Sequence, residues 1–168
     1  SRELAWIPPA DVTTKPLHPG FAASWASLAP LMEVRPAVVV DAANVVGSVP
    51  DGWWRDRPGA AQRLLEKIGR LAVDGVPASL LDLPEHTWFP EWVVVLEGRA
   101  RAAGEDVDGV EVVRAPESGD DAIVVQAERL AVAGRTVTVV TSDRALGERV
   151  TDAGAVVRGT RWLLDQLT

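Results

Sequence analysis

Cysteine is absent from this chain of 168 residues, and its absence excludes both a disulfide framework and a metal site built on thiolates. No apolar run approaches the roughly 20 residues that a membrane-spanning helix requires, and the first residues lack a secretory-signal pattern. Basic residues are in deficit, because 17 Lys and Arg face 24 Asp and Glu, for a formal net charge of -7. We therefore expect a cytoplasmic protein without a membrane partner, whose overall charge does not favour nonspecific binding to nucleic acid.

Hydrophobic residues make up 47% of the chain, which is enough for the core of one domain. Residues 1–36 differ from the rest, because they are rich in proline and contain no long periodic element. From residue 37 onward, short β-branched runs alternate with helical stretches, which is typical of βαβ units around a parallel sheet. We therefore expect an N-terminal appendage over 1–36 and a three-layer α/β domain over 37–168.

Five apolar runs predict the strands of a central, mainly parallel sheet. They are 37–41, 92–97, 110–115, 136–143 and 154–159. Helical periodicity, with Pro at one helix start and Gly after another helix end, predicts the helices between and after these strands. They are 58–73, 119–133, 144–153 and 160–167. The segment 77–83 (PASLLDL) is a further candidate for a short strand.

Acidic side chains follow three of the predicted strands. Asp41 follows VVV, Glu97 follows VVVL, and Asp143 follows TVVTS. In a parallel sheet with right-handed crossovers, all strand C-termini lie at one edge, so we expect these carboxylates to converge. Asp120 and Asp121 stand at the start of the second predicted helix, which such a crossover brings to the same edge.

Carboxylates this close to one another raise each other's pKa and favour a bound cation. Oxygen ligands without Cys or His select hard ions, so the expected cofactor is Mg²⁺ or Mn²⁺. Such an ion lowers the pKa of a bound water and orients it toward a phosphodiester. Each acid also has a structural alternative, because an Asp after a strand often forms a turn and an Asp at a helix start can be a cap. Four acids at matching strand and helix ends together favour the metal site.

Three motifs resemble those of one nuclease family, in the family's order. VVVDAANVVG resembles the opening motif of NYN domains, and ESGDDAIVVQA is similar to the acidic helix start of YacP-like proteins. VTVVTSDRAL resembles the Thr-x-Asp strand end found across PIN-like nucleases. The resemblance covers about residues 36–168. It implies a PIN-like, Rossmann-like fold and a divalent-metal-dependent endoribonuclease that hydrolyses RNA phosphodiester bonds.

The resemblance also implies roles for the individual acids. It makes Asp41, Asp121 and Asp143 metal ligands and catalytic residues, with Asp120 as a supporting acid. Glu97 departs from the pattern, since related NYN domains often have Phe-Asp-Gly at that strand end and this chain has Leu-Glu-Gly. We expect the longer Glu97 side chain to reach the metal either directly or through water.

Four polar residues beside the acids are candidates for substrate binding. Asn44 either holds the first loop or touches substrate, and the residue types alone favour neither role. Thr141 and Ser142 could bind substrate or a metal-bound water, although capping the next helix is the role we favour for Ser142. Arg144 is one of several arginines near the expected edge that could follow a phosphate backbone, although solvated surface is the usual place for most of them.

Two aromatic residues, Trp53 and Trp54, follow the first strand in a loop near the same edge. Stacking on an unpaired base would be worth roughly 1–3 kcal/mol per base, whereas burial of at least one of them against a helix is the favoured alternative. RNA is the expected partner. A homodimer is compatible with the tryptophan content, and PIN-like domains often form one.

Residues 3–28 resemble the C-terminal tail of Nudix hydrolases through a Trp-x-Pro motif and a Leu-His-Pro-Gly-Phe motif. The catalytic Nudix box is missing from the chain, so nucleoside triphosphate pyrophosphohydrolase activity is the least favoured function. A second alternative to RNA hydrolysis stays open, namely a catalytically silent PIN-like module that binds RNA or another protein.

Overall fold

The computed structural model describes residues 6–167, which form two compact units with the boundary between Arg35 and Pro36. Residues 3–5 of the Nudix-like segment lie outside the described residues, and that resemblance stays a prediction. The first unit contains short helices only. They are η1 (Pro9–Thr14), α1 (Pro19–Leu28) and η2 (Ala29–Glu33). His18 caps α1 by accepting a 3.2 Å hydrogen bond from the amide of Gly20, and Trp25 is the buried residue of that helix.

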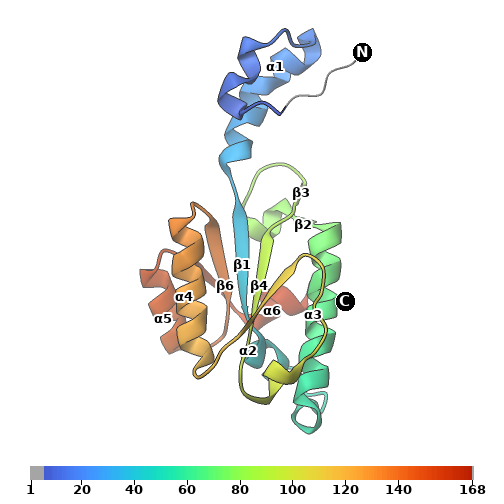
Figure 1. Ribbon diagram of the computed structural model, residues 1–168, viewed down its shortest axis with the longest axis vertical. Coiled ribbons are helices and arrows are strands. Elements are labelled where there is room, and N and C mark those ends of the chain that lie inside the picture. Colours follow the sequence, from blue (N-terminus) through green and yellow to red (C-terminus); the bar gives the residue numbers. More distant parts are fainter. Residues whose placement is uncertain (1–5, 168) are drawn as a thin grey trace. The chain divides into compact units, whose positions relative to one another are not determined.

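The second unit is built on a five-stranded parallel sheet with the order β5-β4-β1-β6-β7 (Figure 1). The strands are β1 (Pro36–Asp41), β4 (Glu91–Leu96), β5 (Val110–Arg114), β6 (Thr136–Val140) and β7 (Val156–Arg158). The helices are α2 (Ala42–Gly47), α3 (Arg57–Asp74), α4 (Gly119–Val132), α5 (Arg144–Asp152) and α6 (Thr160–Leu164). The predicted α/β fold with a central parallel sheet is therefore confirmed.

Helices cover both faces of the sheet, so the central strands are buried on both sides and are apolar at nearly every position. Along β1, Val38 and Val40 pack in the cluster formed with α2, α3 and α6, whereas Ala37 and Val39 pack in the cluster formed with α4 and α5. Figure 1 shows α4 and α5 on one side of the sheet and α3 on the other. This three-layer packing explains why the central strands could be recognised as continuous β-branched runs.

The prediction of an additional strand over 77–83 is wrong for most of that segment. Only Val76–Pro77 forms a short strand, β2, which pairs antiparallel with β3 (Thr87–Trp88). The residues after it form a 3₁₀ turn, η4 (Ala78–Leu81), which ends at Asp82 in the left-handed conformation with φ 54°. None of the helices within residues 6–167 is both long enough and apolar enough to cross a membrane.

Candidate functional site

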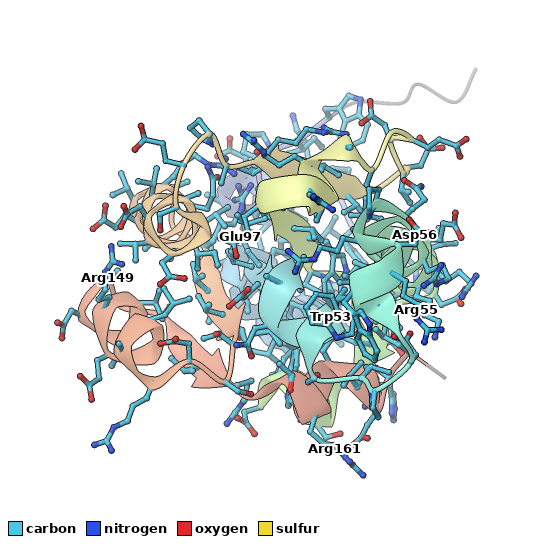
Figure 2. All side chains as sticks on the ribbon, turned by 90° about the horizontal axis from the view of Figure 1, so that it is seen from below. Trp53, Arg55, Asp56, Glu97, Arg149 and Arg161 are labelled. Atoms are coloured by element: carbon cyan, nitrogen blue, oxygen red, sulfur yellow. The ribbon has the colours of Figure 1, made fainter. Side chains whose placement is uncertain are left out.

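The carboxyl ends of the three central strands lie at one edge of the sheet, and a polar residue stands at each end. Parallel pairing aligns β1 with β4 up to Asp41 and β1 with β6 up to Val40. Asp41 is the last residue of β1, Glu97 comes directly after β4, and Thr141 comes directly after β6. Figure 2 shows this edge, with Glu97 near the middle of the view. The strand register thus brings together polar groups that are far apart in the sequence.

Asp41 is held by hydrogen bonds to both of its carboxylate oxygens and is only 8% exposed. Its Oδ1 accepts from the amide of Asn44 at 3.0 Å, and its Oδ2 accepts from the Thr141 hydroxyl at 2.9 Å. Burial raises the pKa of Asp41 above its ordinary value of 3.8. The two hydrogen bonds oppose this rise in pKa, while the negative charges of Asp120 and Glu97 add to it. The Asp41 carboxylate is therefore held in one orientation, and the negative charges of Asp120 and Glu97 act on it.

Thr141 connects Asp41 to Asp143. The Thr141 residue is 2% exposed, and its hydroxyl both donates to Asp41 and accepts from the amide of Asp143 at 3.1 Å. Asp143 is exposed and caps α5, because its Oδ1 accepts from the amide of Leu146 at 2.8 Å. One buried hydroxyl thus sets the spacing between the acid that ends β1 and the acid that begins α5.

Glu97 is bound to the start of α4. Its Oε2 accepts a 2.9 Å hydrogen bond from the amide of Gly119, the first residue of that helix. A Cβ atom at position 119 would lie 2.4 Å from this oxygen, so glycine allows the carboxylate to approach the helix. The positive end of the helix dipole favours a carboxylate at this place. The departure from the family pattern at Glu97 therefore still places an acid beside the helix that carries two more.

The two acids of α4 have different surroundings. Asp121 forms an ion pair with Arg149 of α5, whose Nη2 lies 2.6 Å from its Oδ1. Partial loss of water around the Asp120 carboxylate raises the pKa of Asp120, and the charges of Asp143 and Glu97 raise it further, although Arg149 lowers it. The structure thus brings Asp120 rather than Asp121 together with the strand-end acids. Sequence reasoning did not find Arg149, because no motif links it to α4.

Asn44 and Ser142 join the loops that leave β1 and β6. The Asn44 Oδ1 accepts a 2.8 Å hydrogen bond from the amide of Ser142, which is the loop-holding contact considered for Asn44. The expectation that Ser142 caps the next helix is wrong, because Asp143 is the cap of α5 and the Ser142 hydroxyl accepts from the amide of Thr160 at 3.2 Å. Arg144 is exposed and pairs with Glu148 one turn later at 3.4 Å. The substrate-binding roles of Asn44, Thr141, Ser142 and Arg144 stay predictions.

The donors at this edge suit Mg²⁺ or Mn²⁺ by their chemistry, because they are carboxylate oxygens without sulfur or imidazole among them. The raised pKa values of Asp41 and Asp120 mean that added positive charge would be favourable there. Within residues 6–167, no three His, Asp or Glu side chains are already grouped closely enough to hold a metal ion. Hydrogen bonds to backbone amides orient the carboxylates of Asp41, Glu97 and Asp143 in this arrangement. The ligand set therefore stays a prediction.

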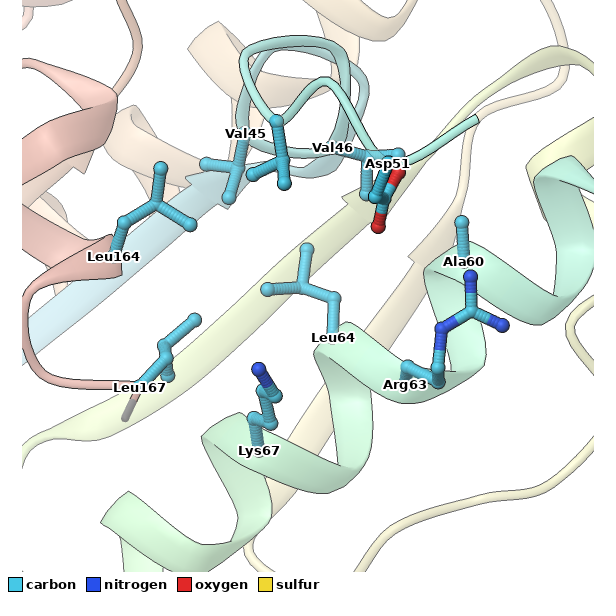
Figure 3. Close-up of a pocket in the computed structure, with 10 residues that line it drawn as sticks. Val45, Val46, Asp51, Ala60, Arg63, Leu64, Lys67, Leu164 and Leu167 are labelled. Carbon is cyan, nitrogen blue, oxygen red and sulfur yellow. The ribbon is translucent and has the colours of Figure 1, made fainter. Parts of the chain in front are cut away.

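A hollow with a volume of about 110 Å³ lies away from the acids, against α2, α3 and the C-terminal residues (Figure 3). Its walls include Val45, Leu64 and Leu164, and Arg63 and Lys67 also line it. None of the predicted catalytic acids is among its lining residues. This hollow is therefore separate from the candidate site.

A five-stranded parallel sheet with helices on both faces and acids at its carboxyl edge defines a three-layer α/β domain. No protein-family model matches the sequence, and comparison with curated proteins gives no match. The structure is similar to the crystal structure of Rae1 (YacP) from Bacillus subtilis, with a TM-score of 0.55, 20% identity, and coverage of 78% of this chain and 72% of that chain. A tryptophan-to-leucine mutant of Rae1 gives a TM-score of 0.58 at 20% identity, with coverage of 79% and 74%. The predicted YacP-like fold is therefore confirmed.

Proposed function

We propose that the domain beginning at Pro36 is a divalent-metal-dependent endoribonuclease that hydrolyses RNA phosphodiester bonds. The observation that carries this proposal is a set of four carboxylates, supplied at or after three strand ends and by one helix start, at the same edge of the sheet. They are Asp41, Glu97, Asp120 and Asp143. The YacP-like fold supports the proposal. The motifs that resemble the family also supply three of these four acids.

We assign the metal to Asp41, Asp120 and Asp143, with Glu97 as a ligand either directly or through water. When bound, Mg²⁺ or Mn²⁺ would lower the pKa of a water molecule and stabilise charge on the leaving oxygen. The family resemblance alone favours Asp121 over Asp120. Because Asp121 forms a direct ion pair with Arg149, while the charges of Asp143 and Glu97 act on Asp120, we prefer Asp120 as the ligand from α4.

The other residues of the edge position the acids and offer contacts to substrate. Thr141 fixes the orientation of Asp41, and the amide of Gly119 fixes that of Glu97. Ser142 and Arg144 border a shallow hollow of about 480 Å³ together with Asp143. Because Asp143, Glu148 and Asp152 also line this hollow, a phosphate group of the substrate would need the divalent ion to offset their negative charge there.

The test is cleavage of single-stranded and structured RNA by the full chain with added Mn²⁺. We expect Asp41→Asn and Asp143→Asn each to lower the rate by at least about 100-fold, the usual scale for loss of one electrostatic stabiliser. Asp120→Asn and Asp121→Asn form a matched pair on one helix, and only Asp120→Asn should lower the rate to this extent. Unchanged cleavage in both the Asp41 and Asp143 variants would refute the proposal. A larger effect at Asp121 than at Asp120 would refute our choice between them.

A catalytically silent RNA-binding module is the second candidate. The observation that favours it is that no three acids within residues 6–167 are already grouped closely enough to hold a metal ion. This candidate predicts measurable affinity for RNA with no hydrolysis in Mg²⁺, Mn²⁺ or any other divalent ion. The same cleavage assay, combined with a binding measurement, therefore separates the two functions.

A further inference from the structure

A small hollow adjoins the acidic edge on the side of α2 and α3. Its volume is about 150 Å³, and its lining includes Trp53 from the turn η3 (Trp53–Arg55), Arg57 from the start of α3, Glu97 and small residues of α2. Figure 2 shows Trp53 and Glu97 at this same edge of the molecule. Because typical pockets for drug-sized ligands measure roughly 300–1,000 Å³, this one suits a single ring system.

The aromatic wall of the hollow is fixed by its own surroundings. Trp53 is half-buried, and its amide donates to the Asp51 carboxylate at 3.1 Å. Its ring meets that of Trp54 edge to face, with centroids 6.3 Å apart and an interplanar angle of 83°. The guanidinium carbon of Arg57 lies 5.2 Å from the centroid of the Trp53 ring. The indole is therefore preorganised, and an aromatic ligand would lose little entropy by stacking on it.

The charge of Arg57 is available to a ligand. Within residues 6–167, Arg57 forms no ion pair with an acid, and its cation–π contact with Trp53 leaves its positive charge uncompensated. An aromatic ring flanked by a guanidinium is the arrangement that binds bases of single-stranded nucleic acid without sequence preference. A base in a duplex has both faces covered by its neighbours, so only an unpaired base can enter a hollow of this size.

A basic groove continues on the other side of Gly98, which lines both hollows. Arg99, Arg101 and Arg114 line this second, shallow hollow of about 780 Å³. Arg101 and Arg114 donate to backbone carbonyls, which are neutral acceptors. Arg114 also forms a long ion pair of 3.9 Å with the exposed Asp106, whereas Arg99 and Arg101 form no ion pair within the described residues and keep their positive charge. A positive groove beside a stacking ring is the usual design of a site for single-stranded nucleic acid. It also offsets locally the unfavourable net charge of the chain.

We infer that the hollow between Trp53 and Glu97 holds one unpaired RNA base, stacked on Trp53 beside Arg57, with the neighbouring phosphates directed over the groove of Arg99, Arg101 and Arg114. The base site makes unpaired RNA the substrate class of the nuclease, and that consequence rests on the function proposed above. The binding itself does not depend on hydrolysis. It can therefore be tested separately.

The experiment measures the affinity of the full chain for a short, fluorescently labelled, unstructured RNA by anisotropy in EDTA, where metal-dependent hydrolysis is stopped. Trp53→Leu should weaken binding about tenfold, the scale of one lost base stack, and Trp53→Phe should restore most of it. Arg55→Gln is the matched control, because Arg55 lies in the same turn, contacts the Trp54 ring at 5.9 Å and does not line the hollow. A blunt RNA duplex should bind more weakly than the single strand.

Equal affinities of Trp53→Leu and the intact chain, an equal loss of affinity in the Arg55→Gln control, or equal binding of duplex and single strand would each overturn the base site. Absence of any RNA binding would overturn it as well. If Trp53→Leu weakens RNA binding but neither the intact chain nor any variant cleaves RNA in Mn²⁺, the base site stands and the nuclease proposal fails. If the intact chain cleaves RNA and Trp53→Leu binds it normally, the nuclease proposal stands and the base site fails.

Discussion

Replacing Thr141 with valine tests whether one buried hydroxyl organises the acidic edge. Valine keeps the shape of the side chain but removes the bond to the Asp41 carboxylate and the bond from the amide of Asp143. A hydrogen bond to a charged group contributes about 1.5–3 kcal/mol and a neutral one about 0.5–1.5 kcal/mol. We therefore expect the free energy of unfolding to fall by about 2–4 kcal/mol, or roughly 5–15 °C in melting temperature for a domain of this size.

The assay is thermal and urea unfolding of the full chain without divalent ions. Thr138→Val is the matched control, because Thr138 lies on β6, the strand that Thr141 directly follows, is 9% exposed, and makes no side-chain hydrogen bond within the described residues. It should change the free energy of unfolding by less than about 1 kcal/mol. The Thr141 variant should also raise the pKa of Asp41, because a hydrogen bond that lowers it is lost. Equal destabilisation by both substitutions would refute the reasoning.

Two further predictions concern charge and space at the same edge. The pKa values of Asp41 and Asp120 in the folded state lie above 3.8, so the folded state binds more protons than the unfolded state just above that pH. Without metal, the free energy of unfolding should therefore fall as pH rises from 3.8 through the raised pKa values. Urea unfolding over a pH series measures this change, and a rise in the free energy of unfolding would contradict it. Gly119→Ala should displace the Glu97 carboxylate from α4 and weaken Mn²⁺ binding in a thermal-shift titration, whereas Gly104→Ala, whose Cβ would meet only a carbonyl oxygen at 3.9 Å, should not. Equal Mn²⁺ affinities for the two alanine variants would show that Glu97 does not take part.

The fold could be predicted from the sequence because its strands are buried on both faces. Continuous β-branched runs mark β1, β4 and β6, and helical periodicity marks α3 and α4. The prediction for the segment 77–83 is wrong, because a short apolar run looks the same in a strand and in a 3₁₀ turn. In the structure the 3₁₀ turn ends at Asp82 in the left-handed conformation, which the apolar pattern of the segment did not predict.

The sequence by itself determined that acids stand at strand ends and at a helix start, since each carboxylate follows an apolar run whose direction the parallel topology fixes. Only the tertiary structure decided which acid of α4 belongs to the site. Consecutive residues of a helix point about 100° apart, so the packing of α4 beside α5 pairs Asp121 with Arg149 and leaves Asp120 near the strand-end acids. The hydroxyl of Thr141 between Asp41 and Asp143 likewise depends on two strands meeting in register, and that contact lies beyond any local pattern.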